Sequence, residues 1–312
     1  MKVTFVFPGQ GAQRPGMGAA LSEAYPPARA VFDCLGATLG QELVDLAFNG
    51  PEAELTRTVN AQPAMLAVSV AAGRVAQSLG LEPAAAAGLS VGEYAALVMA
   101  GSLTLPDAFR LVRLRGELME SSCPRGLGGM TAVIGLPAAE VARLCREESG
   151  HGVVEVANHN APDQTVMSGE RKALDRVAGR CVEAGAKRVI PLAVSAPFHT
   201  SLLRPAGEGL AKALAQVAIA DPNLPVVANV TAAYVRTADQ VRANLAAQVS
   251  SPVRWCESVE RLWADGQRVF VELGPGKTVS GLVKRIVPDA VAAGAEDPPS
   301  FQKLLDSLGV VC

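Results

Sequence analysis

Short apolar runs alternate with stretches of helical periodicity along this chain, and that alternation restricts the fold more than any other feature. It predicts an α/β fold, in which helices cover a largely parallel sheet. With 312 residues, of which 49% are hydrophobic and 19% charged, the chain can bury a substantial core. We therefore expect one large domain, or one domain that carries a smaller one.

The predicted elements of the large domain begin with a buried strand at residues 2–7, since the run from Val3 to Phe7 is largely apolar. Pro63 favours a helix start at Gln62, because proline is well tolerated in the first helical turn. Further strands are expected at residues 84–89, 225–230 and 268–273, and helices at residues 62–79, 91–100, 106–121 and 278–286.

The middle of the chain has a different rhythm, which begins at the glycine-rich stretch 126–129. Its predicted elements are a strand at 130–134, a helix at 137–148, strands at 153–157 and 165–168, a helix at 172–184 and a strand at 188–194. This βαββαβ order is the ferredoxin-like signature. We therefore predict a large domain formed by residues 1–127 and 195–312 and an inserted subdomain formed by residues 128–194.

Composition excludes several classes of function. The net charge is −2 and no long basic run occurs, so no nucleic-acid partner is expected. No stretch of about 18 apolar residues occurs, so no membrane partner is expected either. The six cysteines form no CxxC pair, which favours free thiols in a reducing compartment over a metal site. A cytoplasmic location without a bound metal follows as an expectation.

The motif that carries chemistry is Gly88-Leu-Ser-Val-Gly92, a G-x-S-x-G sequence. In hydrolase-like α/β folds, it forms a strand-to-helix turn that exposes the serine, and the next backbone N–H helps to bind an oxyanion. A chain with 30 glycines also produces the pattern by chance, so the predicted strand before it and the helix after it matter. We predict that Ser90 is a nucleophile.

A serine nucleophile needs a base, and the chain has only three histidines. His151 lies in a predicted surface turn, and His159 lies just after a strand of the insert. His199 lies between a strand and a helix of the large domain, where α/β folds collect catalytic groups. His199 is therefore the favoured base, and a loop histidine without a role is the alternative.

Arg115 lies within an apolar stripe of its predicted helix, seven residues after Ala108. A buried guanidinium needs an anionic partner, and its planar fork fits a carboxylate. That partner is either an internal carboxylate, such as Glu93 or Glu117, or a carboxylate of the substrate.

The loop after the first strand, residues 8–13, is rich in glycine but lacks the nucleotide-binding G-x-G-x-x-G pattern, because Arg14 occupies the last glycine position. Close approach of the backbone to the active site is the expected use of these glycines.

These residues together resemble the malonyl-CoA:acyl carrier protein transacylase family, which includes free-standing acyltransferases of fatty acid and polyketide synthesis. The resemblance covers nearly the whole chain. Its motifs are Gly-Gln-Gly-Ala-Gln at 9–13, Gln-Pro at 62–63, Gly-Leu-Ser-Val-Gly-Glu at 88–93, Arg-Gly-Glu-Leu-Met at 115–119, Ala-Pro-Phe-His at 196–199, Gln-Val-Ser-Ser-Pro-Val-Arg-Trp at 248–255 and Glu-Leu-Gly-Pro-Gly-Lys at 272–277. It implies a hydrolase-like parallel-sheet core with a ferredoxin-like insert.

The resemblance also implies an activity, which is transfer of a malonyl group from malonyl-CoA to an acyl carrier protein. The coenzyme A thioester is the substrate, and no permanently bound cofactor is expected. The implied site roles are Ser90 as nucleophile, His199 as base, the Gln248 carbonyl as its orienting group, the Gln10 and Val91 N–H groups as oxyanion hole, Arg115 as partner of the malonyl carboxylate, and Gln62, Met119 and Phe198 as pocket residues. Leu89 stands where many members have a histidine.

Three alternatives remain at this point. A serine hydrolase or thioesterase would need an acid between Ser90 and His199, and Asp163 is the most obvious one, although we predict it in a turn of the insert. An acyltransferase of polyketide synthesis could use another acyl-CoA. A non-catalytic module that binds carrier protein would not need both Ser90 and His199.

Overall fold

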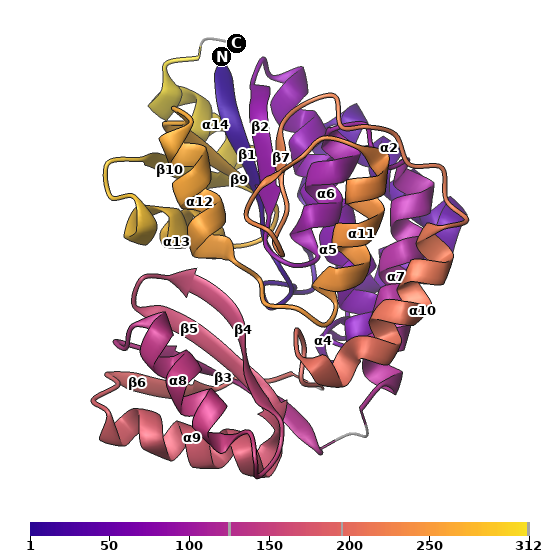
Figure 1. The fold of residues 1–312 in the computed structure, drawn as a ribbon. Helices are drawn as coiled ribbons and strands as arrows, with labels where there is room; N and C mark the ends of the chain where they lie inside the picture. The colour runs from indigo at the N-terminus through magenta and orange to yellow at the C-terminus, as the bar shows by residue number, and fades with distance from the viewer. Residues whose placement is uncertain (124–125, 195, 311–312) are drawn as a thin grey trace.

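The structure, a computed structural model, describes residues 1–123, 126–194 and 196–310. These residues form a six-stranded, mostly parallel sheet covered by helices and a separate four-stranded antiparallel sheet (Figure 1). The predicted α/β class with a second, antiparallel unit is confirmed. Figure 1 shows the smaller sheet with its two helices as a lobe below the larger sheet.

The six-stranded sheet has the order β10-β9-β1-β2-β7-β8. Its strands are β1 (Lys2–Phe7), β2 (Glu82–Gly88), β7 (Val226–Val227), β8 (Tyr234–Val235), β9 (Val269–Leu273) and β10 (Val291–Ala295). All neighbours pair in parallel except β7 with β8. Successive side chains of a strand face opposite sides, so Phe5 and Phe7 of β1 enter one core cluster and Val6 enters another.

Helices cover both faces of this sheet. On the Phe5 side lie α2 (Pro26–Leu39), α5 (Thr58–Ser78), α6 (Gly92–Met99) and α7 (Leu105–Ser121), and on the Val6 side lie α12 (Trp255–Ala264) and α13 (Thr278–Ile286). The other helices are α1 (Ala19–Ala24), α3 (Gln41–Asn49), α4 (Glu52–Leu55), η1 (Ser201–Leu203), α10 (Arg204–Leu214), α11 (Ala238–Gln248) and α14 (Pro298–Leu308). In the described part of the chain, no helix combines the length and hydrophobicity that crossing a bilayer requires.

The small lobe has the strand order β4-β5-β3-β6, with every neighbouring pair antiparallel. Its elements are β3 (Gly128–Ile134), α8 (Ala138–Glu148), β4 (Val154–Ala161), β5 (Gln164–Glu170), α9 (Arg171–Glu183) and β6 (Arg188–Pro191). Both helices pack on the same face through a core that includes Val133, Leu144 and Val177. The βαββαβ order predicted from the sequence is therefore present. Its predicted end falls beside Ser195, which lies outside the described residues, as does Cys312.

Several local predictions were wrong. The helix predicted from Gln62 begins at Thr58, so Pro63 lies inside α5 and not in its first turn. The strand predicted at 225–230 is only the two residues of β7, because the chain turns away from the sheet after Val227. His159 lies within β4 and not after it.

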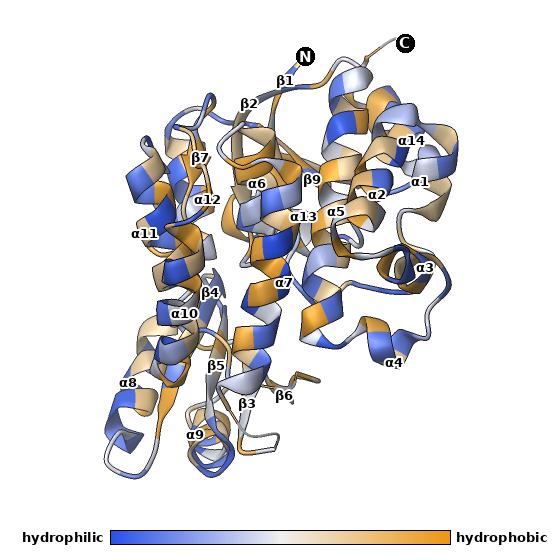
Figure 2. Ribbon diagram, turned by 90° about the vertical axis from the view of Figure 1, so that its right-hand side faces the viewer, coloured by the Kyte–Doolittle hydropathy of each residue, from blue (hydrophilic) through white to orange (hydrophobic). Residues whose placement is uncertain are grey.

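Helix α7 has the predicted amphipathic character, and Figure 2 shows hydrophobic and hydrophilic residues alternating along it. Arg115 is 1% exposed, whereas Arg110 on the opposite side is exposed. The side chain of Arg115 thus points into the protein, as its place in the apolar stripe predicts.

Candidate active site

Ser90 lies at the turn between β2 and α6 and has a φ of 53°, in the left-handed region that residues with a Cβ seldom adopt. The flanking glycines permit this tight turn. A Cβ at Gly88 would lie 2.0 Å from the Gly92 backbone, and one at Gly92 would lie 2.4 Å from the carbonyl oxygen of Phe7. The elbow therefore packs directly against the end of β1.

The described residues place Ser90 beside His199. Ser90 Oγ lies 2.8 Å from His199 Nε2, and His199 Nδ1 lies 2.8 Å from the carbonyl oxygen of Gln248. The three groups come from the elbow, from the loop before η1 and from the end of α11, which are far apart in the sequence. The three groups thus have the arrangement that a nucleophile, its base and an acceptor that orients the base require.

The proton positions follow from the chemistry of the partners. A guanidinium only donates, so Ser90 Oγ accepts from Arg115 Nη2 at 3.1 Å. The serine hydroxyl hydrogen is then available to His199 Nε2. The Gln248 carbonyl only accepts, so Nδ1 of His199 carries the ring proton. This is the tautomer in which Nε2 can remove the serine proton.

The electrostatics keep His199 neutral. Burial, and to a lesser extent the nearby charge of Arg115, lower its pKa to about 4, and hydrogen bonds with the backbone of Gln248 and Ser251 partly oppose this shift. The imidazole is therefore uncharged at neutral pH, as a general base must be.

Arg115 donates to two amide oxygens, Gln62 Oε1 at 2.8 Å and Gln248 Oε1 at 3.0 Å. Among the described residues it forms no ion pair, and its Nε has no hydrogen-bond partner. Burial lowers its pKa, which the neighbouring Tyr94 and Glu93 oppose. The internal salt bridge considered from the sequence is not formed, because Glu117 pairs with Arg113 and Glu93 accepts from amide groups. A buried cation without a carboxylate partner among the described residues therefore lies beside Ser90.

A cavity of about 280 Å³ opens onto these groups between the large sheet and the small lobe. Ser90, Arg115 and His199 line it, together with Gln10 and Val91, whose backbone N–H groups have no hydrogen-bond partner within the described ranges. The other predicted pocket residues Gln62, Met119 and Phe198, and also Leu89, line it as well. Gln62 Nε2 lies 3.5 Å from Met119 Sδ and Gln62 Oε1 accepts from Arg115, so both ends of the side-chain amide are held.

Comparison with known proteins shows the family of this chain. The acyl transferase domain family model matches residues 4–296. The malonyl CoA-acyl carrier protein transacylase of Salmonella typhimurium is 43% identical over 96% of this chain and 98% of its own length. The chain belongs to the malonyl-CoA:acyl carrier protein transacylase family.

Solved structures of the transacylase family superpose closely on this fold. The crystal structure of an acyl carrier protein S-malonyltransferase from Vibrio cholerae has a TM-score of 0.94 and 43% identity, and covers 97% of this chain and 100% of that one. A malonyl transacylase in complex with its type II polyketide synthase acyl carrier protein has a TM-score of 0.95 and 42% identity, and covers 98% of this chain and 100% of that one.

Sequence reasoning missed Asn229 and considered Glu93 only as a salt-bridge partner of Arg115, but both residues bond to groups around Ser90. Asn229 is buried and bonds to the elbow through its side chain, and the Glu93 carboxylate accepts from Asn229 N at 3.0 Å and from Gln248 Nε2 at 2.7 Å. Burial raises the pKa of Glu93 to about 7 against these donors and Arg115. Asn229 lies near the end of the strand predicted at residues 225–230, and a polar residue at a strand end is the signal that could have pointed to it.

The residues weighed against His199 lie elsewhere. His151 is exposed in a surface turn, and His159 Nδ1 lies 3.1 Å from Glu257 Oε2. Asp163 lies in the turn between β4 and β5, as predicted, and pairs with Arg285. None of the three contacts Ser90 or His199 among the described residues, so the acid of a hydrolase triad is not found at Asp163.

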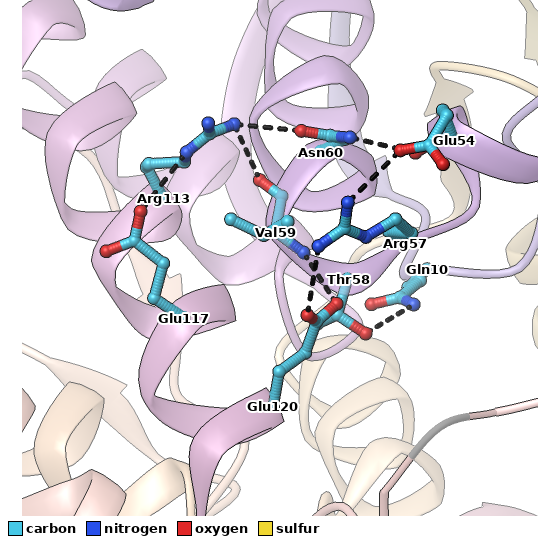
Figure 3. Close-up of polar contacts among 9 residues, drawn as sticks. All are labelled: Gln10, Glu54, Arg57, Thr58, Val59, Asn60, Arg113, Glu117 and Glu120. Carbon is cyan, nitrogen blue, oxygen red and sulfur yellow. Dashed lines mark hydrogen bonds and ion pairs between the residues drawn. The ribbon is translucent and has the colours of Figure 1, made fainter. Parts of the chain in front are cut away.

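Pro63 breaks the hydrogen-bond pattern of α5 close to Gln62, because proline has no N–H for the carbonyl of Val59. Arg113 of α7 supplies the missing donor, with Nη1 3.3 Å from Val59 O and 2.9 Å from Asn60 Oδ1 (Figure 3). Glu120 of α7 also accepts from Val59 N and pairs with Arg57, just before α5. Figure 3 further shows Gln10 bonded to Thr58 and Arg57 paired with Glu54 of α4. Helix α7 therefore holds the start of α5, and with it Gln62, against Arg115.

Proposed function

We propose that this chain transfers a malonyl group from malonyl-CoA to the phosphopantetheine thiol of an acyl carrier protein, by a ping-pong reaction through an ester on Ser90. The observation that carries this proposal is the contact between Arg115 Nη2 and Ser90 Oγ at 3.1 Å. A buried cation that lacks a carboxylate partner within the described residues lies next to an activated nucleophile. An acyl group that ends in a carboxylate suits such a site.

The first half-reaction forms the ester. His199 Nε2 takes the hydroxyl proton while Ser90 Oγ attacks the thioester carbonyl carbon. The N–H groups of Gln10 and Val91 donate to the resulting oxyanion. When the C–S bond breaks, the coenzyme A sulfur leaves and receives the proton from His199. The malonyl carboxylate pairs with Arg115 throughout.

The second half-reaction runs the same steps in reverse with another thiol. The carrier-protein thiol gives its proton to His199 and attacks the Ser90 ester, and the Ser90 oxygen regains that proton on leaving. Side chains and backbone groups of this chain supply every step, so we propose no bound cofactor beyond the thioester substrate. The cytoplasmic location and the absence of nucleic-acid and membrane partners stay predictions from the sequence.

Intact mass spectrometry after mixing with malonyl-CoA tests the proposal. We expect the protein to gain one malonyl group, to keep it in water and to lose it when a holo acyl carrier protein is added. Ser90→Ala should gain no mass, because loss of the nucleophile costs several orders of magnitude in rate. Rapid loss of the malonyl group in buffer alone would instead indicate a hydrolase.

A further inference from the structure

The side chain of Asn229 spans the two sides of the serine elbow. Its Nδ2 donates to the carbonyl oxygen of Gly88 at 2.7 Å, and its Oδ1 accepts from the backbone N–H of Ser90 at 2.7 Å. Asn229 is fully buried, so water does not compete for these bonds. One amide group thus links the residue at the end of β2 to the nucleophile.

The elbow needs such a restraint because Ser90 has a left-handed backbone conformation. A conformation of this kind persists where the surrounding structure holds it. Both backbone polar groups of Ser90 are held. The Ser90 N–H donates to Asn229 Oδ1. The Ser90 carbonyl oxygen accepts from Gln248 Nε2 at 3.1 Å and from Glu93 N at 3.0 Å.

Asn229 is itself fixed by its own backbone. Its N–H donates to Glu93 Oε2 at 3.0 Å, and its carbonyl oxygen accepts from Arg254 N at 2.9 Å. Glu93 lies on α6, the helix that follows the elbow, so Asn229 is bonded both to the elbow and to the helix that begins there. Asn229 therefore has little freedom to let the elbow relax.

We infer that Asn229 is a positioning residue for the transfer reaction, holding Ser90 Oγ in line with His199 and leaving the Val91 N–H free for the oxyanion. Asn229 touches neither substrate pocket nor base, since its bonds go to the elbow, Glu93, Gln248 and Arg254. The inference rests on the proposed function where it is tested by transfer kinetics. Where it is tested by hydrogen exchange, it rests on the elbow geometry alone.

The kinetic assay compares Asn229→Ala and Asn229→Asp with Asn223→Ala, a matched change at an exposed asparagine. We expect kcat of Asn229→Ala to fall about 100-fold, the scale of a 1 Å misplacement of a reacting group. The KM for malonyl-CoA and the malonyl-to-acetyl preference should stay within about threefold, because Arg115 is untouched. Asn229→Asp keeps the acceptor for Ser90 N–H but loses the donor to Gly88, so it should lie between.

Two kinetic results would overturn the inference. One is a folded Asn229→Ala protein with kcat within threefold of the wild type. The other is a rise in KM together with a loss of malonyl preference, which would make Asn229 a pocket residue.

If the variants do not fold, amide hydrogen exchange of the wild-type protein tests whether Asn229 restrains Ser90. The Ser90 amide should exchange far more slowly than the Val91 amide, and equal rates would overturn the inference. This result does not depend on the substrate. A wild-type protein that transfers no malonyl group but protects Ser90 would refute the proposed function and leave the elbow restraint standing.

Discussion

At the scale of single residues, the site depends on Arg115 being charged, buried and hydrogen-bonded only to neutral oxygens, those of Gln62, Gln248 and Ser90, among the described residues. Gln62 and Gln248 each accept one hydrogen bond from Arg115 without neutralising its charge. We therefore expect a malonyl carboxylate to form a bidentate pair with Arg115. An acetyl group would leave the guanidinium without that pair.

Replacing Arg115 should separate the two substrates. Arg115→Ala should lower kcat/KM for malonyl-CoA by about two to three orders of magnitude, since breaking a buried charge pair costs roughly 3–5 kcal/mol. Acetyl transfer should be unchanged or faster. Arg115→Lys should restore only part of the malonyl activity, because an ammonium lacks the planar fork. Steady-state rates with both thioesters measure this, and an equal loss for both would make Arg115 a structural residue.

The depressed pKa of His199 sets the acid side of the rate profile. The base works only when neutral, and its pKa of about 4 keeps it neutral well below the usual 6.5. We expect kcat/KM for malonyl-CoA to be supported by His199 down to about pH 5 and to fall near pH 4. A malonyl carboxylate offsets the charge of Arg115, so the fall in kcat should come at a higher pH.

Two variants identify the groups behind that profile. Exposed His151→Gln should leave it unchanged. Glu93, with a pKa raised to about 7, titrates near neutrality, so any change in rate there should disappear in Glu93→Gln. An acid limb at pH 6.5 that survives in Glu93→Gln would contradict the expectation for His199.

At the scale of elements, α5 and α7 bring Gln62 and Arg115 together. Their packing is close, since a Cβ at Gly116 would lie 2.8 Å from the Cα of Val59. The carbonyl that Pro63 leaves free lies at the same place and accepts from Arg113. The irregular start of α5 is thus compensated by a side chain from α7.

Replacing two arginines of α7 by glutamine, one at a time, tests this contact. Arg113→Gln removes a donor from the Val59 carbonyl, so the free energy of unfolding should fall by about 1 kcal/mol. The KM for malonyl-CoA should rise a few-fold as Gln62 shifts. Arg110→Gln removes only an exposed pair with Asp107 and should change neither quantity measurably. Denaturant titration gives the free energy of unfolding, and steady-state kinetics give the KM. If Arg113→Gln and Arg110→Gln do not differ in these quantities, α5 needs no support from Arg113.

At the scale of the whole molecule, strand β4 of the small lobe is tied to the large lobe beside the active site. His159 N donates to Val253 O at 2.9 Å and Val253 N donates to Ala157 O at 2.8 Å. Glu155 accepts from the N–H and the hydroxyl of Ser201, at 2.7 and 2.6 Å. Ser201 follows His199 by two residues, so the small lobe helps to hold the base. We propose residues 128–194 as a subdomain with this role.

Glu155→Ala should therefore slow catalysis from a distance. We expect kcat to fall about tenfold, less than the roughly 100-fold cost of a full 1 Å displacement, with little change in KM. Glu155→Gln can still accept from the Ser201 N–H and should recover part of the rate. Glu183→Ala, a change at an exposed glutamate of the same lobe, is the control. If Glu155→Ala behaves like that control, the small lobe does not position His199.

The sequence by itself determined the features that depend on near neighbours. The apolar run of β1, the glycines around Ser90 and the place of Arg115 on an apolar helical face all follow from local sterics or from the periods of helix and strand. The position of His199 between a predicted strand and helix favoured it as the base, and motifs matched to a family added Gln248. The position of Pro63 in its helix was predicted wrongly. Pro63 leaves the Val59 carbonyl without a helical donor, and that carbonyl accepts from Arg113, which lies 54 positions from Val59 in the sequence.

Only the tertiary structure decided what surrounds these groups. Periodicity tells which face of a helix is buried, but it does not tell which distant segment covers that face. Asn229 bonds to Ser90 across 139 residues, and Gln248 bonds to Ser90 across 158. The amide partners of Arg115, the neutral state of His199 and the restraint on the elbow exist only after such segments meet, because buried polar groups take their partners and their pKa values from packing.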